Sequence, residues 1–184
     1  MSTDLHDTSL ALLQKAHCDA LHALANDAHI SPTSSIPHPC PPEVVTGWLA
    51  DNQNAQGPQK NFTILHKGEI AGVAMLKKID HAAKHAELAY WVGYPFWGKG
   101  IGQRAAQITV QHAFTHMGLQ RLHSHCLKQG NPASRKILER LGFVPDAQRA
   151  DMPTEDRFAQ LFPGDFWAFY ALTLQEFTAA KRHL

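Results

Sequence analysis

The chain has 184 residues, of which 44% are hydrophobic and 18% charged, and its formal net charge is +1. This length and composition predict a single globular domain spanning residues 1–184. No apolar run approaches the ~20 residues needed to cross a bilayer, and residues 1–7 lack the basic and apolar segments of a signal peptide. The three cysteines have no metal-like spacing. We therefore expect a protein of the reducing cytoplasm with no membrane partner.

Basic residues are concentrated in the middle of the chain. Residues 1–60 carry two Lys or Arg and six Asp or Glu, residues 61–141 carry eleven and four, and residues 142–184 carry four and six. This distribution favours an anionic ligand near the middle third. Nucleic acid is the competing partner, but the basic residues are scattered rather than gathered in a run, so we expect no nucleic-acid binding.

The first third of the chain predicts a strand, a helix and a long loop. Residues 9–13 form an apolar run typical of a strand, and residues 17–26 have helical spacing of their apolar positions. Residues 31–42 contain five prolines and predict an irregular loop. A short helix is expected over residues 43–49, with Pro42 placed just before it.

The middle of the chain predicts three antiparallel strands. Residues 61–65 and 70–76 are apolar runs joined by a short turn that contains Gly68, which is a hairpin signal. A third strand follows over residues 87–92 after the polar connection 80–85, and it should pair with its predecessor.

The last part of the chain predicts two helices and two strands. A helix running to about Met117 should bury Ala106, Val110, Ala113 and Met117, and residues 121–127 form the next strand. Asn131 and Pro132 are typical of a helix start, and Gly142 of its end. The final strand is expected over residues 166–174.

A glycine-rich turn connects the strand over residues 87–92 to the helix that follows it. Gly93 and Pro95 end the strand, and three glycines at alternate positions open the helix. These are Gly98, Gly100 and Gly102. Such a turn leaves backbone N–H groups unpaired at the positive end of the helix dipole, which favours a phosphate ligand. Lys99 lies within the turn and suits the same ligand.

Two nucleotide-binding motifs do not fit this turn. A P-loop requires Ser or Thr after the lysine, but Gly100 follows Lys99. A dinucleotide fingerprint requires a third glycine one residue later and an acidic residue about 20 positions on, where Arg121 and Leu122 stand. A glycine turn without any ligand is the remaining structural alternative.

The turn resembles the acetyl-CoA-binding motif of the GNAT N-acetyltransferases, with Gly100 and Gly102 at the motif glycines and Trp97 in place of its Gln or Arg. That tryptophan is similar to the branch containing the ribosomal-protein N-terminal (alanine/serine) acetyltransferases. The resemblance extends to Asn131-Pro-Ala-Ser134, to Leu141-Gly-Phe143 and to residues 164–172. It implies an α/β fold of the GNAT type, in which helices flank a mixed, mostly antiparallel central sheet with a splayed strand pair. The first strand and helix would form one wall of the acceptor site.

The resemblance implies acetyl-CoA as cosubstrate. The backbone of the motif strand would pair with the pantetheine arm, one N–H at Val92 would polarise the thioester carbonyl, and the amides of residues 98–103 would hold the pyrophosphate. The cofactor-binding residues expected on this basis are Trp91, Val92, Gly93, Trp97, Gly98, Lys99, Gly100, Ile101, Gly102, Gln103 and Asn131.

Two residues are candidates for catalysis. Glu87 lies ten residues before Trp97, close to the spacing of the family's general base, and its apolar strand neighbours predict a raised pKa. The structural alternative is a carboxylate bonded to an amide or an arginine. Ser134 would donate to the departing thiolate, as in the N-terminal acetyltransferase branch. Its alternative is a hydroxyl bonded within the first helical turn.

The thirteen histidines raise the question of a metal site. His112 and His116 are four apart on a helix, and His123 and His125 share a strand face, but neither pair has a third ligand in sequence. We expect surface histidines and no metal.

The acceptor is expected to be a primary amine, with the α-amine of a peptide or protein N-terminus favoured and the protein acting as a monomer or homodimer. The alternatives are a small amine, such as a polyamine, aminoglycoside or amino acid, and a non-catalytic acyl-CoA-binding module.

Overall fold

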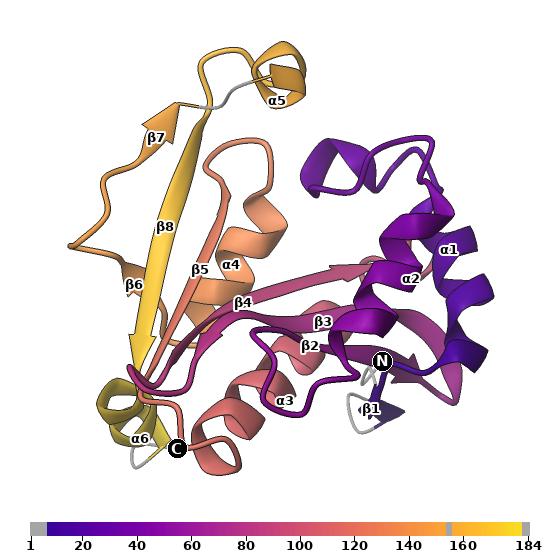
Figure 1. Ribbon diagram of the computed structural model, residues 1–184. Helices are drawn as coiled ribbons and strands as arrows, with labels where there is room; N and C mark the ends of the chain where they lie inside the picture. Colours follow the sequence, from indigo (N-terminus) through magenta and orange to yellow (C-terminus); the bar gives the residue numbers. More distant parts are fainter. Residues whose placement is uncertain (1–6, 154–155, 182–184) are drawn as a thin grey trace.

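The computed structural model describes residues 7–153 and 156–181. The sequence-based expectation for residues 1–7, that they are not a signal peptide, concerns a segment of which residues 1–6 lie outside the described residues. One twisted sheet forms the centre of the molecule, and helices pack on both of its faces (Figure 1). Within the described residues, no helix is long and apolar enough to span a membrane.

The sheet has eight strands in the order β1-β2-β3-β4-β5-β8-β6, and β7 also pairs with β8. All pairs are antiparallel except β4 with β5. The strands are β1 (Thr8–Leu12), β2 (Lys60–His66), β3 (Glu69–Asp80), β4 (His85–Val92), β5 (Arg121–Leu127), β6 (Val144–Pro145), β7 (Met152–Pro153) and β8 (Phe166–Thr173). This arrangement confirms the expected fold class.

Residues 7–153 and 156–181 also contain six α-helices and three short 3₁₀ turns. The helices are α1 (Cys18–Ala25), α2 (Pro42–Asp51), α3 (Ile101–Thr115), α4 (Pro132–Arg140), α5 (Asp156–Leu161) and α6 (Leu174–Lys181). The 3₁₀ turns are η2 (Lys15–His17), η3 (Ser31–Thr33) and η4 (Tyr94–Phe96). Helices α1 and α2 cover one face of the sheet, and α3 and α4 lie on the other (Figure 1).

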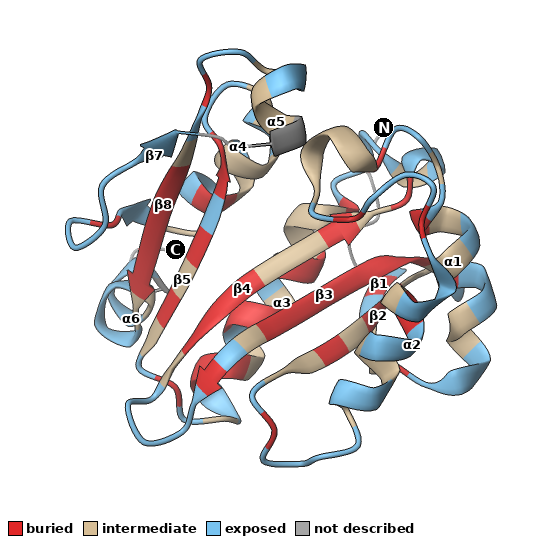
Figure 2. Ribbon diagram, turned by 45° about the horizontal axis from the view of Figure 1, so that its top comes forward, coloured by how far each residue is buried: buried red, intermediate tan, exposed pale blue. Residues whose placement is uncertain are grey.

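The alternation of side chains along β4 divides the core in two. Trp91 packs with the α1 and α2 side chains, and Ala89 contacts the same cluster. Leu88 and Tyr90 point to the opposite face and pack with α3 and α4. Figure 2 shows the buried residues concentrated along β3, β4, β5 and β8. These two faces follow from the two-residue period of a strand.

Strands β4 and β5 separate after a short paired segment. Residues 85–87 of β4 pair with residues 121–123 of β5. The Ser124 hydroxyl then donates to the Leu88 carbonyl oxygen at 2.9 Å, and no ladder pairs follow. The splayed pair implied by the family resemblance is therefore confirmed, and the far end of β4 pairs with β3 alone.

The structure differs from the sequence-based expectations at several short segments. The irregular loop 31–42 contains η3, and α2 begins at Pro42 itself. Strands β6 and β7 have two residues each, too few for a periodic pattern, and α5 and α6 were not predicted. Met117 is half-buried rather than buried, because α3 ends before it at Thr115.

Candidate active site

The glycine turn between β4 and α3 presents free backbone amides. Gly98 and Gly100 both have φ of +74°, a left-handed conformation that favours glycine, and Gly100 caps α3. The helical ladder starts with Arg104 N–H donating to Gly100 O at 3.1 Å. The N–H groups of residues 101–103 therefore have no partner within the helix. They point outward from its N-terminus, which is the positive end of the helix dipole.

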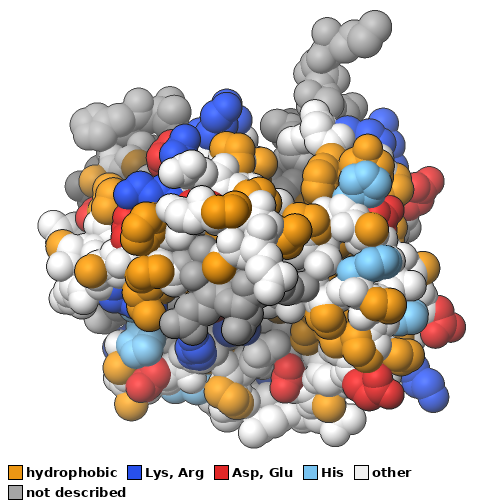
Figure 3. Space-filling model, turned by 90° about the horizontal axis from the view of Figure 1, so that it is seen from above, with side chains coloured by type: hydrophobic (Ala, Val, Ile, Leu, Met, Phe, Trp, Pro, Cys, Tyr) orange, Lys and Arg blue, Asp and Glu red, His pale blue; other side chains and the backbone are white. Residues whose placement is uncertain are grey.

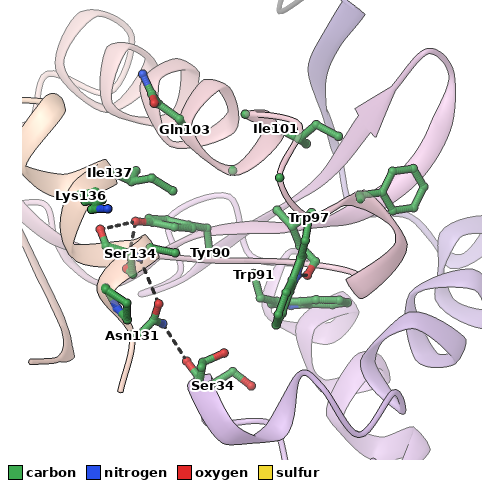
Figure 4. Close-up of a pocket in the computed structure, with 18 of the residues that line it drawn as sticks. Ser34, Tyr90, Trp91, Trp97, Ile101, Gln103, Asn131, Ser134, Lys136 and Ile137 are labelled. Atoms are coloured by element: carbon green, nitrogen blue, oxygen red, sulfur yellow. Dashed lines mark hydrogen bonds between the residues drawn. The ribbon is translucent and has the colours of Figure 1, made fainter. Parts of the chain in front are cut away.

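A cleft of about 550 Å³ runs from this turn across β4 to the start of α4 (Figure 4). The loop after α1 closes it on the far side, through Ile30, Thr33 and Ser34. Ten of the predicted site residues line it: Trp91, Val92, Trp97, Gly98, Gly100, Ile101, Gly102, Gln103, Asn131 and Ser134.

Three predicted residues do not line this cleft. Gly93 packs against α1, where an added Cβ would come within 2.8 Å of the Leu24 side chain. The Lys99 ammonium turns back to donate to Pro95 O at 3.0 Å. Glu87 lies near the start of β4, where β4 and β5 are still paired.

Two basic residues of α4 line the cleft and were not predicted. Lys136 and Arg140 are four residues apart and so share one face of the helix. The Arg140 guanidinium also donates to Gln103 Oε1 at 3.0 Å, which connects α4 to the first turn of α3. The spacing of the two cations after the N-cap Asn131 was the signal that could have identified them.

The backbone of β4 offers a donor toward the gap between β4 and β5. Gly93 N–H donates to Ala71 O at 2.8 Å across the β3–β4 ladder. Because hydrogen bonds alternate along an antiparallel strand, the N–H of Val92 points the other way, toward the splayed side. The Trp97 indole donates to the Val92 carbonyl at 2.6 Å and fixes this peptide segment.

Two hydroxyl groups meet where the cleft passes between β4 and α4. Tyr90 Oη lies 3.1 Å from Ser134 Oγ (Figure 4). Burial raises the pKa of the Tyr90 phenol well above its ordinary value, although the bond with Ser134 opposes this. Tyr90 therefore stays protonated and can polarise the serine hydroxyl. This role of Tyr90 was not predicted.

Asn131 has two structural roles at the same place. Its Oδ1 accepts from the Ser134 amide at 3.0 Å, which confirms the predicted N-cap of α4. Its Nδ2 donates to Thr33 O at 3.2 Å, so it also ties α4 to the loop after α1. The turn before Asn131 is held by Asp165, whose carboxylate accepts from the amides of Gln129 and Gly130 at 2.9 and 2.7 Å.

Glu87 is buried, at 5% exposure, in a cluster of basic residues. Burial acts to raise its pKa, but the hydrogen bond from Lys78 at 2.7 Å and the nearby positive charges outweigh that effect. The pKa of Glu87 is lowered, and the expectation of a raised pKa is wrong. Its apolar strand neighbours misled the prediction, because the cations come from β3 and not from β4.

His125 of β5 lies beside Glu87, with Nδ1 3.8 Å from Oε1. Its ring packs edge-on against Trp167 and tilted against Phe169. These surroundings lower the pKa of His125, while the Glu87 carboxylate acts in the opposite direction. His123 turns instead to Asp146, at 3.2 Å. Among residues 7–153 and 156–181, no three ligands gather as a metal site requires.

These features fit coenzyme A. Free amides at the start of a helix, two cations on α4 and a narrow gap beside an unpaired strand suit a pyrophosphate, a further phosphate and an amide-containing arm. In the view from above, hydrophobic side chains gather on both sides of the molecule (Figure 3).

Comparison with known proteins agrees with this geometry. The family model described as an acetyltransferase (GNAT) domain matches residues 9–144. The chain is similar to "Putative ribosomal N-acetyltransferase YdaF" of Bacillus subtilis, at 33% identity over 59% of this chain and 57% of that protein. It is also similar to spermidine N(1)-acetyltransferase of Escherichia coli, at 27% identity over 78% of this chain and 76% of that protein.

A solved structure shares the fold. The ribosomal-protein alpha-N-acetyltransferase RimL in complex with coenzyme A has a TM-score of 0.77 and 23% identity, covering 92% of this chain and 96% of that one. The chain spans little more than half the length of YdaF, so the acceptor of that relative does not transfer directly. The family match covers well over half of the chain. The chain therefore belongs to the GNAT acetyltransferase family.

Proposed function

We propose that the enzyme transfers acetyl directly from acetyl-CoA to the α-amine of a peptide or protein N-terminus, within a ternary complex. The observation that carries this proposal is the state of Glu87, on the sheet face that α1 and α2 partly cover. Lys78 and Lys77, at 2.7 and 3.8 Å, favour its ionised form. A carboxylate with a lowered pKa is a weak base, which suits an amine that is already partly neutral.

The basicity of the acceptor decides how strong a base is needed. An α-amine with a pKa of about 8 is about one-tenth neutral at pH 7, whereas a lysine side chain with a pKa of about 10.4 is neutral in about four parts in ten thousand. The difference corresponds to about 3 kcal/mol that a lysine-directed enzyme has to recover. The weakly basic Glu87 supports the α-amine.

Trp91 gives independent support for a peptide. It lines the cleft, and its indole Nε1 is buried with no hydrogen-bond partner among the residues that the structure describes. A peptide carbonyl would satisfy this donor, because an unpaired buried N–H is costly. Spermidine has no carbonyl group to offer.

Residues on the two sides of β4 have different roles in the proposed reaction. Those on the side of α3 and α4 bind the cofactor and assist the departure of the thiolate. The amides of Ile101, Gly102 and Gln103 bind the pyrophosphate, together with Lys136 and Arg140. The Val92 N–H polarises the acetyl carbonyl. The Ser134 hydroxyl, polarised by Tyr90, gives its proton to the departing thiolate.

Proton removal from the acceptor takes place on the opposite side. Glu87 is the base expected from the sequence, but its lowered pKa makes it a weak base on its own. We assign the proton to the ring of His125, which is neutral near pH 7, with Glu87 stabilising the imidazolium that forms. Glu87 then acts as a positioning carboxylate for the His125 ring, 3.8 Å away.

The second candidate function is acetylation of spermidine, favoured by the long alignment with the spermidine acetyltransferase. Lys77 and Lys78 lie beside Glu87, the carboxylate that would have to attract a polycation. Their positive charges would repel spermidine, which argues against this second function. A non-catalytic acyl-CoA-binding role is separated from both by measuring thiol release.

The decisive experiment compares three acceptors at saturating acetyl-CoA. These are a peptide with a free N-terminus and blocked lysine, the converse peptide, and spermidine. We expect the first to give the highest kcat/KM. Faster turnover of the N-blocked peptide, or turnover of spermidine alone, would overturn the proposal.

We also propose a cytoplasmic enzyme that acts as a monomer or homodimer. The three cysteines are free thiols, two of them buried, which supports a reducing compartment.

A further inference from the structure

The structure places two consecutive lysines beside one carboxylate. The β3–β4 register shifts between Lys77 and Asp80, and Lys78 adopts φ of +49° within this irregularity. Successive side chains of a regular strand point to opposite faces, but the irregularity brings both lysines to Glu87. Lys78 Nζ lies 2.7 Å from Oε2, and Lys77 Nζ lies 3.8 Å from Oε1.

A third cation lies on the same side of the sheet. The Arg149 guanidinium stacks over the Phe169 ring, 4.0 Å from its centroid. Phe169 in turn contacts the ring of His125 at a centroid distance of 5.7 Å. Within the described part of the chain, Arg149 forms no ion pair with a carboxylate. This cationic cluster consists of Lys77, Lys78 and Arg149 around Glu87 and His125.

The cluster holds more positive charge than Glu87 requires. Lys78 at 2.7 Å is sufficient to balance one buried carboxylate, and Lys77 and Arg149 then remain in excess. His125 adds no negative charge. The excess lies where β4 and β5 begin to separate, on the face opposite α3 and the phosphate-binding amides. An amine that approaches the cleft from this face therefore passes a positive surface.

We propose that the cationic cluster is a specificity site for a carboxylate of the acceptor, so that the preferred acceptor is a peptide N-terminus followed within its first few residues by Asp or Glu. This inference rests on the proposed function, because it assumes an α-amine acceptor. The argument is charge complementarity: two uncompensated cations attract a carboxylate and repel a lysine side chain or a polyamine.

Phe169 supports this assignment through the geometry of Arg149. A guanidinium stacked on an aromatic ring is held in a defined orientation while its N–H edges stay available for a carboxylate. Arg149 is exposed, and changing it leaves both lysines beside Glu87 in place.

The test uses the full-length enzyme, acetyl-CoA and three peptides that begin with Ser and continue with Asp-Asp, Asn-Asn or Lys-Lys, with blocked C-termini. We expect the Asp-Asp peptide to exceed the Lys-Lys peptide by about tenfold or more in kcat/KM at low ionic strength. At about 1 M salt, where the screening length is about 3 Å, the ratio should fall strongly.

A charge reversal separates recognition from a structural effect. Arg149→Glu should lower kcat/KM for the Asp-Asp peptide and raise it for the Lys-Lys peptide, and Lys77→Gln should reduce the preference. Lys67→Gln, in the β2–β3 turn at the other end of β3, is the matched control and should change neither value. A uniform loss for all peptides in Arg149→Glu would overturn the inference.

The outcomes also distinguish this inference from the proposed function. Equal rates for the three peptides would disprove the carboxylate site and leave an N-terminal acetyltransferase. Absence of turnover on every peptide, with turnover of spermidine, would instead disprove the proposed function.

Discussion

Tyr90 and Ser134 are 44 positions apart in sequence, and their hydroxyl oxygens lie 3.1 Å apart across the cleft. One comes from the splayed strand β4 and the other from the first turn of α4. Each is fixed independently, Tyr90 by packing in the core and Ser134 by the Asn131 cap. The pair therefore forms a preorganised proton donor at the place where the thiolate departs.

Removal of either hydroxyl should slow turnover without weakening cofactor binding. We expect Ser134→Ala to lower kcat by about tenfold or more, within the range for proton-transfer assistance, with little change in the Kd of acetyl-CoA. Tyr90→Phe should lower kcat by a smaller factor, because Ser134 remains. Steady-state kinetics and calorimetry measure both quantities.

Tyr94→Phe provides the control for the Tyr90 variant. Tyr94 is 44% exposed and stacks on His29, outside the cleft-lining residues. It should keep the wild-type kcat. Wild-type turnover in Ser134→Ala would show that this hydroxyl has a structural role only, through its contact with Tyr90.

The serine was predictable because its signal is local. Asn131, Pro132 and Ser134 form a compact helix start whose chemistry can be read from adjacent residues. The tyrosine was not, because its role depends on β4 and β5 separating to let α4 approach. Neither strand's own sequence shows where two strands that are 36 residues apart stop pairing, so this separation could not be predicted.

The cations of α4, rather than the lysine in the glycine turn, should contribute to coenzyme A affinity. We expect Lys136→Gln and Arg140→Gln to raise the Kd of acetyl-CoA, because each removes a positive charge from the cleft. Lys99→Gln is the matched control, since its ammonium bonds to Pro95 O. Titration calorimetry with CoA and dephospho-CoA measures the effects.

The glycine turn offers a stronger version of the same test. Gly100 has φ of +74°, so Gly100→Glu combines backbone strain with a negative charge beside the phosphate site. Acetyl-CoA should no longer raise the Tm of this variant. An unchanged thermal shift would place the phosphates elsewhere.

The pH profile should identify the residue that takes the proton of the acceptor. The pKa of His125 is lowered, so its ring is neutral at pH 7 and becomes protonated only at lower pH. We expect kcat/KM of the wild type to fall as pH decreases through this pKa. His125→Gln should lose activity at neutral pH and recover part of it at high pH, where the amine deprotonates unaided.

Glu87→Gln gives the complementary measurement. Loss of the carboxylate removes the interaction that stabilises the imidazolium and so lowers the pKa of His125 further, and the acidic limb of the profile should move to lower pH. His123→Gln is the control, since that ring faces Asp146 and should not move the limb. An unchanged profile in His125→Gln would return the role of base to Glu87.

Glu87 shows why the electrostatics of the site could not be predicted from its own strand. Leu88 and Ala86 suggest an apolar environment, and burial alone would raise the pKa. The lysines that reverse the shift reach Glu87 through an irregularity in β3, and His125 comes from β5. The sequence therefore predicted the strand that carries Glu87 correctly and the charge environment of the carboxylate wrongly.

Asp165 should contribute to stability and to the shape of the cleft. Its carboxylate is buried at 3% exposure and accepts from the amides of Gln129, Gly130 and Phe166. Asp165→Asn leaves one oxygen for these donors and should cost on the order of 2 kcal/mol in the free energy of unfolding. Because the turn leads into Asn131, the KM of acetyl-CoA should rise as well.

The pH dependence of this loss identifies the ionised carboxylate as its cause. Burial acts to raise the pKa of Asp165, but the amide hydrogen bonds outweigh it, and the folded-state pKa is lowered. Its contribution is therefore fully present above the ordinary pKa of about 3.9 and decreases as pH falls through the folded-state value. The Tm difference between wild type and Asp165→Asn should be constant from pH 5 to 7 and shrink below about pH 4. A difference that stays the same at low pH would show that the side chain acts by packing rather than by charge.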